Sequence, residues 1–267
     1  MPLTDLSQAV ISLPSYLFAL ANLLILAVAI ALLTFFTVRG HRTAWRCIGM
    51  GAVCFFVSAM VLEQLLHSLV LGAFPDLTSH PVAYMLYASL AAGIFEETAR
   101  LVGLRRLCRG DNGPRTGFAY GIGHGGVELL LLGVYPAWQT LVTFYLINSG
   151  ELAKSVSGLT DAQMQTLLSQ VSALQQTAPA LFLLGGVERL MAMGMQLALS
   201  MLVWMVVTGR LSRRWFAGAV VLHAVLDVPA ALYQCGVLPL LTCELLIAVL
   251  LIAAAALVLR LYRRTAA

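Results

Sequence analysis

Glu96, Glu97 and Arg100 have the side chains best suited to chemistry, and they lie inside an apolar run, 82–104. A charged residue at the centre of a membrane helix costs roughly 2.5–3.5 kcal/mol on insertion scales, so such groups persist when they pair or line a cavity. On a helix both glutamates lie one turn from Arg100, so one arginine can hold the carboxylate pair. The pair still needs partners from other helices.

Two more apolar runs each carry a histidine and an acid spaced i,i+4, which places both on one helix face. At about 1.5 Å per residue, the two histidines and the acid pair all lie roughly 10–12 Å from the cytoplasmic ends of their helices. We therefore predict one cavity, open to the cytoplasmic side. Its expected lining is Glu96, Glu97, Arg100, His124, His223 and Asp227, with Glu128 one turn deeper, orienting His124 or closing the floor.

The elements that position these residues are membrane helices. The 267 residues are 60% hydrophobic and only 10% charged, whereas soluble domains carry about 25% charged residues. Since 13 of the 16 Lys and Arg flank apolar runs in four clusters, the net charge of +4 indicates membrane topology rather than a nucleic-acid surface. The clusters are Arg39/Arg42/Arg46, Arg105/Arg106/Arg109/Arg115, Arg210/Arg213/Arg214 and Arg260/Arg263/Arg264.

The apolar runs predict an all-α, polytopic protein with about seven transmembrane helices in a single domain, 1–267, in the cell membrane. With the N-terminus outside and the C-terminus cytoplasmic, all four arginine clusters fall inside. The expected spans are 15–38, 47–73, 82–104, 116–148 with a kink at Pro136, 179–207, 216–235 and 240–260. The stretch 150–178 is expected to form an extracytoplasmic amphipathic helix that packs over the bundle.

The chain resembles a known family through four motifs taken together: Glu-Glu-x-x-Arg, Gly-x-Gly-His-Gly-Gly-x-Glu, Glu-Arg and His-x-x-x-Asp. These resemble the YhfC-like family of intramembrane proteases. That family is similar to PrsW-type proteases, to the CAAX prenyl endopeptidase and bacteriocin-processing proteins, and to the seven-span anterior-pharynx-defective subunit of gamma-secretase. The resemblance implies that Glu96, Glu97 and Arg100 form the acid motif and that His124 and His223 are the membrane histidines.

Three departures from the wider group matter. Prenyl-protease relatives usually space the acid motif one residue longer, and Asp227 stands where they often hold Asn. Gln196 occupies a position where a three-histidine zinc site would be expected to have its third histidine. The gamma-secretase subunit is a scaffold, so the fold alone does not imply proteolysis.

The leading hypothesis is an intramembrane endopeptidase that hydrolyses peptide bonds in or near the bilayer. Glu96 would activate water, Arg100 would keep its neighbour ionised, and His124 and His223 would polarise the scissile carbonyl. The rival is a non-catalytic membrane scaffold or chaperone subunit with a structural polar core. A proton-coupled transporter is a third hypothesis, although the sequence shows no inverted repeat of the kind found in many transporters.

For a cofactor, the sequence favours a metal-free, glutamate-driven site because only two histidines lie deep in the helices. The alternative is zinc bound by His124, His223 and a carboxylate. Expected partners are a membrane protein or peptide substrate and the lipid bilayer, with no nucleic acid. Glu63 and Glu244 are assigned structural roles, so Glu→Gln at either is expected to be nearly silent.

The topology gives a first prediction. Reporter fusions at Asp111 and Ser157 should report opposite sides of the membrane, because an arginine-rich loop contains the first and an arginine-free stretch contains the second. Activity of a cytoplasmic reporter and of an extracytoplasmic reporter at each position measures this. The same side for both positions would contradict the seven-helix arrangement.

Overall fold

The computed structural model describes residues 6, 8–107, 113–156 and 158–266. Within these ranges the ordered elements are helices and no strand occurs, which confirms the all-α class. Arg109 and the two fusion positions, Asp111 and Ser157, lie outside the described residues.

Six helices of the described chain are long and apolar enough to cross a membrane, which makes this a multi-pass membrane protein. They are Leu13–Val38 (α2), Arg42–Ala73, Pro114–Asn148, Pro179–Val207 (α10), Arg214–Gln234 (α11) and Leu240–Thr265, the last within α12 (Leu240–Ala266). The predicted third span is α5 (Pro81–Val102), a continuous helix whose two glutamates and arginine lower its hydropathy. Seven crossings and the orientation of the termini therefore stay predictions.

Two of the long helices contain π-helical turns. Arg42–Ala73 consists of α3 (Arg42–Phe55), the π-helix η1 (Phe56–Glu63) and α4 (Gln64–Ala73). Pro114–Asn148 consists of α6 (Pro114–Leu129), the π-helix η4 (Leu130–Val134) and α7 (Tyr135–Asn148). The expected break at Pro136 is thus a wider turn just before it. Proline cannot donate to the carbonyl four residues back and its ring crowds that carbonyl, which a wider turn relieves.

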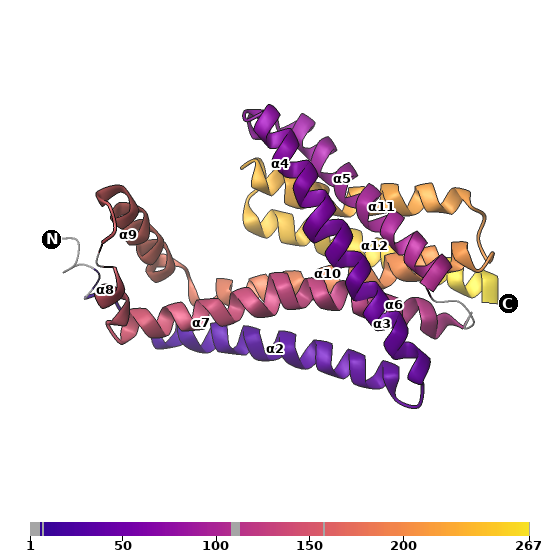
Figure 1. Ribbon diagram of the computed structural model, residues 1–267, viewed down its shortest axis with the longest axis horizontal. Helices are drawn as coiled ribbons and strands as arrows, with labels where there is room; N and C mark the ends of the chain where they lie inside the picture. Colours follow the sequence, from indigo (N-terminus) through magenta and orange to yellow (C-terminus); the bar gives the residue numbers. More distant parts are fainter. Residues whose placement is uncertain (1–5, 7, 108–112, 157, 267) are drawn as a thin grey trace. The chain divides into compact units, whose positions relative to one another are not determined.

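The described residues group into two compact units, coloured along the chain in Figure 1, and the prediction of a single domain is left open. Unit one is residues 1–29 and 130–189. In it α9 (Asp161–Gln176) begins with a capping box between Thr160 and Gln163. Its apolar face packs Val171 and its neighbours against a core that includes Phe144 and Ile147, while the extracytoplasmic position of the stretch 150–178 stays a prediction. A shorter helix, α8 (Glu151–Ser155), precedes it.

Unit two is residues 30–129 and 190–267, and it holds every predicted site residue. Its core is formed mainly by α3, α6, α12 and the later part of α10, around the fully buried Tyr120 and Leu202. A π-helix, η3 (Gly103–Leu107), follows α5, and a short 3-10 turn, η2 (Leu77–Ser79), precedes it. Figure 1 shows α4 and α5 running side by side within this unit.

Glycines let the site helices approach closely. A Cβ on Gly51 would lie 2.1 Å from the Tyr120 carbonyl oxygen, so α3 and α6 touch backbone to backbone. A Cβ on Gly93 would lie 2.7 Å from the Val220 carbonyl oxygen, which brings α5 equally near α11. Small residues at helix crossings allow this approach in membranes. As a result the acid motif on α5 lies within side-chain reach of His124 and His223.

Candidate active site

Arg100 is the centre of a buried polar cluster in unit two. Its side chain is fully buried, and Nε donates to Glu97 Oε2 at 3.0 Å. Nη1 donates to the Gln196 carbonyl oxygen at 3.1 Å and to the Ser200 hydroxyl, and Nη2 donates to the Gln196 side-chain oxygen. The guanidinium therefore joins α5 to α10. Sequence spacing allows it to hold both glutamates, and in the structure it bonds directly to Glu97.

Glu97 is held from two sides. Its Oε2 accepts from Arg100, and its Oε1 lies 2.7 Å from His223 Nδ1 on α11. The opposite nitrogen of the same imidazole, Nε2, lies 3.4 Å from Asp227 Oδ2 and 4.0 Å from Glu96 Oε1. Glu97 thus fixes the ring of His223 so that Nε2 points toward two other carboxylates.

Glu96 has a different set of partners. Its Oε2 lies 2.9 Å from His124 Nε2 and accepts from the Gln196 amide nitrogen at 3.0 Å. His124 is fully buried, with its ring edge-on to Phe55 and tilted against Tyr120. Among the described residues its Nδ1 has no hydrogen-bond partner. Glu96 is therefore the acid of the pair that contacts histidine without a direct bond to the arginine.

The structure brings all seven predicted site residues into one network. Glu128 joins it through Gln196, whose amide nitrogen donates to Glu128 Oε2 at 2.8 Å. This bond connects Glu128 to α10, while its expected role in orienting His124 or closing the cavity floor stays a prediction. Their convergence agrees with the shared depth deduced from helix rise, whereas their catalytic roles and the cytoplasmic opening of a common cavity stay predictions.

Gln196 and Ser200 belong to this network although sequence reasoning gave neither a place in it. From its type and position in the sequence, Gln196 indicates only that a third histidine for zinc is missing there. The signal that could have found both is their i,i+4 spacing on α10, which puts two polar residues on one face of an otherwise apolar helix.

Side-chain exposure is graded across the cluster. Glu97 and Arg100 are 0% exposed and His223 is 1% exposed, whereas Glu96 is 10% and Asp227 is 28% exposed. Asp227 and Glu96 are the most exposed of these five side chains and form the outer edge of the cluster. Glu97 and Arg100 lie behind that edge and hold it in place.

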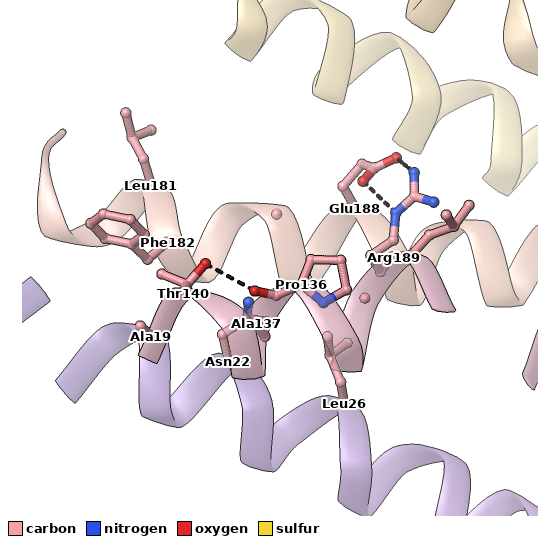
Figure 2. A pocket seen from close by; sticks show the side chains of 13 residues that line it. Ala19, Asn22, Leu26, Pro136, Ala137, Thr140, Leu181, Phe182, Glu188 and Arg189 are labelled. Carbon is pink, nitrogen blue, oxygen red and sulfur yellow. Dashed lines mark hydrogen bonds and ion pairs between the residues drawn. The ribbon is translucent and has the colours of Figure 1, made fainter. Parts of the chain in front are cut away.

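A separate cavity lies in unit one and does not contain the predicted site (Figure 2). It has a volume of about 280 Å³ and lies among α2, α7 and the first part of α10. Arg189 donates to both carboxylate oxygens of Glu188 there, and the Thr140 hydroxyl donates to the Pro136 carbonyl at 2.9 Å (Figure 2). Among the described lining residues none is a histidine, so this cavity lacks the glutamate–histidine pairing of unit two.

Comparison with known proteins decides the family. The model of the YhfC intramembrane metalloprotease family matches residues 23–251. The chain belongs to this family. The YhfC membrane protein of Bacillus subtilis (strain 168), described as uncharacterized, is 32% identical over 223 residues, which cover 82% of this chain and 85% of the relative. No solved structure matches the chain.

The family's description as a metalloprotease implies a metal, and the donor set of the cluster suits zinc. Zinc prefers histidine nitrogen and carboxylate oxygen, and metal-bound histidines usually donate their second N–H to a carboxylate, as His223 Nδ1 can toward Glu97. The outward nitrogen faces Asp227 and Glu96. In the described residues the donors bond to one another, and no three are grouped around an ion position. By donor type the residues suit zinc, and His124, His223 and Asp227 would hold it.

The burial of Arg100 gives a prediction about stability. Arg100→Met should lower the free energy of unfolding by about 3–5 kcal/mol, because it leaves the buried Glu97 charge without its cation. Thermal unfolding in detergent measures this. Arg105→Met, at an exposed position on η3, should change the unfolding midpoint little. Equal midpoints for the two variants would contradict a central role for the guanidinium.

Proposed function

We propose that the chain is an intramembrane endopeptidase that hydrolyses peptide bonds in or beside the bilayer. The observation that supports this most is that the two glutamates of the acid pair have different partners. Glu97 is locked between Arg100 and His223, whereas Glu96 contacts His124 at the more exposed edge of the cluster. A carboxylate that can both reach water and exchange a proton with imidazole suits general base catalysis.

In the proposed reaction, Glu96 takes a proton from water as the water oxygen attacks the carbonyl carbon of the peptide. The developing oxyanion is stabilised by N–H groups of His124 and His223, which the surrounding network holds rigidly. Glu96 then returns the proton to the nitrogen of the leaving amine, and the C–N bond breaks. In the zinc alternative, the histidine nitrogens would bind the metal instead of donating to the oxyanion, and zinc would supply Lewis-acid polarisation and a more acidic water.

The substrate proposed for this site is a membrane protein or peptide delivered through the bilayer, with no role for nucleic acid. The site residues lie on helices that we propose to cross the membrane. A peptide segment within or beside the bilayer would therefore reach the site more directly than a soluble protein would. The exposed edge at Asp227 and Glu96 is the proposed docking edge for the scissile bond.

One observation favours the rival, a non-catalytic scaffold or chaperone subunit. The donors and acceptors of the cluster largely satisfy one another, as expected of a structural polar core. The two functions predict different effects of removing one charge from the cluster. In a scaffold the removal should destabilise the fold, whereas in a protease it should lower the rate of cleavage.

Glu96→Gln tests the proposal because it keeps the size of the side chain and removes its basicity. We expect cleavage to fall about 10²–10⁴-fold, the usual contribution of a general base. The assay is cleavage of a quenched-fluorescent set of single-span peptides co-reconstituted in liposomes, with thermal unfolding measured in parallel. Glu244→Gln, on α12, is the matched control and should retain activity.

The outcomes separate the two functions. Full cleavage by Glu96→Gln would remove Glu96 from the chemistry. Loss of the fold without an effect on chemistry would favour the scaffold.

Metal content gives a further prediction. Purified protein should contain about one zinc per chain, and both His223→Ala and His124→Ala should lose it, because they remove the nitrogen donors. Elemental analysis by mass spectrometry measures the ratio. His80→Ala, at an exposed position before α5, should retain the metal. Metal-free protein with full cleavage activity would favour the glutamate-driven site instead.

A further inference from the structure

A second polar group lies on a π-helix that packs against α5. Glu63 is the last residue of the π-helix η1, and its side chain is only 9% exposed. π-helical turns are rare and occur frequently at functional sites, and a buried carboxylate in a membrane helix is costly. The helix η1 packs against α5, which carries the acid motif. The wide turn and the buried acid together mark this position for a role beyond packing.

Glu63 lies within electrostatic range of Glu96, His223 and Asp227. These are the three groups of the cluster that meet around His223 Nε2. From the sequence, Glu63 is expected to have only a structural role. The structure connects the Glu63 carboxylate with the cluster electrostatically, so we no longer expect Glu63→Gln to be silent.

From Glu63 a chain of hydrogen bonds leads away from the cluster. Glu63 Oε1 lies 3.2 Å from His67 Nε2, and His67 Nδ1 lies 2.7 Å from the Tyr87 hydroxyl on α5. The side chain of His67 is 23% exposed. An imidazole bonded through both nitrogens can accept a proton on one side and release a proton from the other. The chain therefore joins a buried carboxylate to a partly exposed histidine and tyrosine.

The positions of these residues along their helices show where the chain of hydrogen bonds leads. His67 and Tyr87 each lie about 9 Å along the axis from the helix ends at Ala73 and Pro81. One turn further toward that end, the Tyr84 hydroxyl donates to the Gln234 side-chain oxygen at 2.6 Å. The polar side chains thus continue toward the connection 74–80, which contains no Lys or Arg.

We propose that Glu63, His67 and Tyr87 form a proton-transfer branch of the site, an inference that rests on the proposed hydrolytic function. Hydrolysis breaks the C–N bond and forms a C–O bond with the oxygen of water. One proton of that water goes through Glu96 to the leaving nitrogen. The other stays on the new carboxyl group and must leave before the product can depart as a carboxylate.

In this branch the carboxylate of Glu63 accepts that second proton and passes it to His67 Nε2. The proton on Nδ1 moves to the Tyr87 hydroxyl, which releases its own proton to water at the end of the bundle near 74–80. No electrons change hands, and each group returns to its starting state once His67 resets its tautomer. Glu63, His67 and Tyr87 act after the bond is cleaved, so they govern turnover rather than substrate binding.

The test is chemical rescue of His67→Ala in the liposome cleavage assay. We expect kcat to fall about tenfold or more with KM unchanged, because a proton-transfer group contributes to turnover. Added imidazole should restore kcat, since the site of His67 is partly exposed and imidazole can carry a proton. Pyrrole, which has the same ring shape without a basic nitrogen, should not. Glu63→Gln should lower kcat in the same way, and imidazole should not rescue it.

Further variants provide a control and a test that does not depend on the folding of His67→Ala. His80→Ala should keep the kcat of the unsubstituted protein with and without imidazole. Tyr87→Phe and His67→Gln keep the size of the side chains, so they test the branch if His67→Ala folds poorly, and both should lower kcat. Equal rescue by pyrrole and imidazole would assign His67 to packing and overturn the proposal.

The result for Glu96 distinguishes failure of the branch from failure of the proposed function. If Glu96→Gln abolishes cleavage while Glu63→Gln and His67→Ala cleave normally, the branch is wrong and the hydrolytic function stands. If Glu96→Gln cleaves normally, or the unsubstituted protein does not cleave at all, the hydrolytic function falls and the branch falls with it.

Discussion

A fully buried guanidinium constrains the whole of unit two. Arg100 presents five N–H donors on a planar fork, and each donor left without an acceptor in a low-dielectric interior is costly. Glu97 on its own helix can satisfy only part of this need, so acceptors must come from α10 through Gln196 and Ser200. The cation therefore specifies which helices meet and at what register. His223 follows, because Glu97 is fixed by Arg100 and in turn fixes the imidazole.

Backbone contact is the second requirement, since a network of short side-chain bonds closes only if the helices lie unusually near one another. Gly51 and Gly93 provide this proximity, because at each of them any larger residue would meet a backbone carbonyl of the facing helix. The same crossings bring the histidines of α6 and α11 to the acid motif of α5. Polar attraction and small-residue packing are thus two parts of one arrangement, and neither alone would gather Glu96, His124 and His223.

Sequence reasoning reached the site through depth and periodicity. Helix rise placed Glu96, His124 and His223 in one layer, and the i,i+4 rule put Asp227 beside His223, as the structure has it. It did not predict the hydrogen bonds between α5 and α10. The rotation of α10 decides which of its residues face α5, and a mostly apolar helix gives little periodic signal of that rotation. Sequence reasoning also did not connect Glu63 with the site. A π-helical turn changes the register of the residues around it, and regular helix geometry applied to Arg42–Ala73 cannot anticipate that change.

Gln196 explains why a histidine is absent from the place where a three-histidine zinc site would have one. The residue there must accept from Arg100 and donate to both Glu96 and Glu128. A primary amide has one acceptor oxygen and two N–H donors on the same end of the side chain, whereas a neutral imidazole has one acceptor and one donor on separate sides. The Arg100 contact also fixes the amide orientation, since a flipped amide would set N–H against N–H. Position 196 is therefore shaped by the arginine network, and any metal must rely on the two histidines and the carboxylates around them.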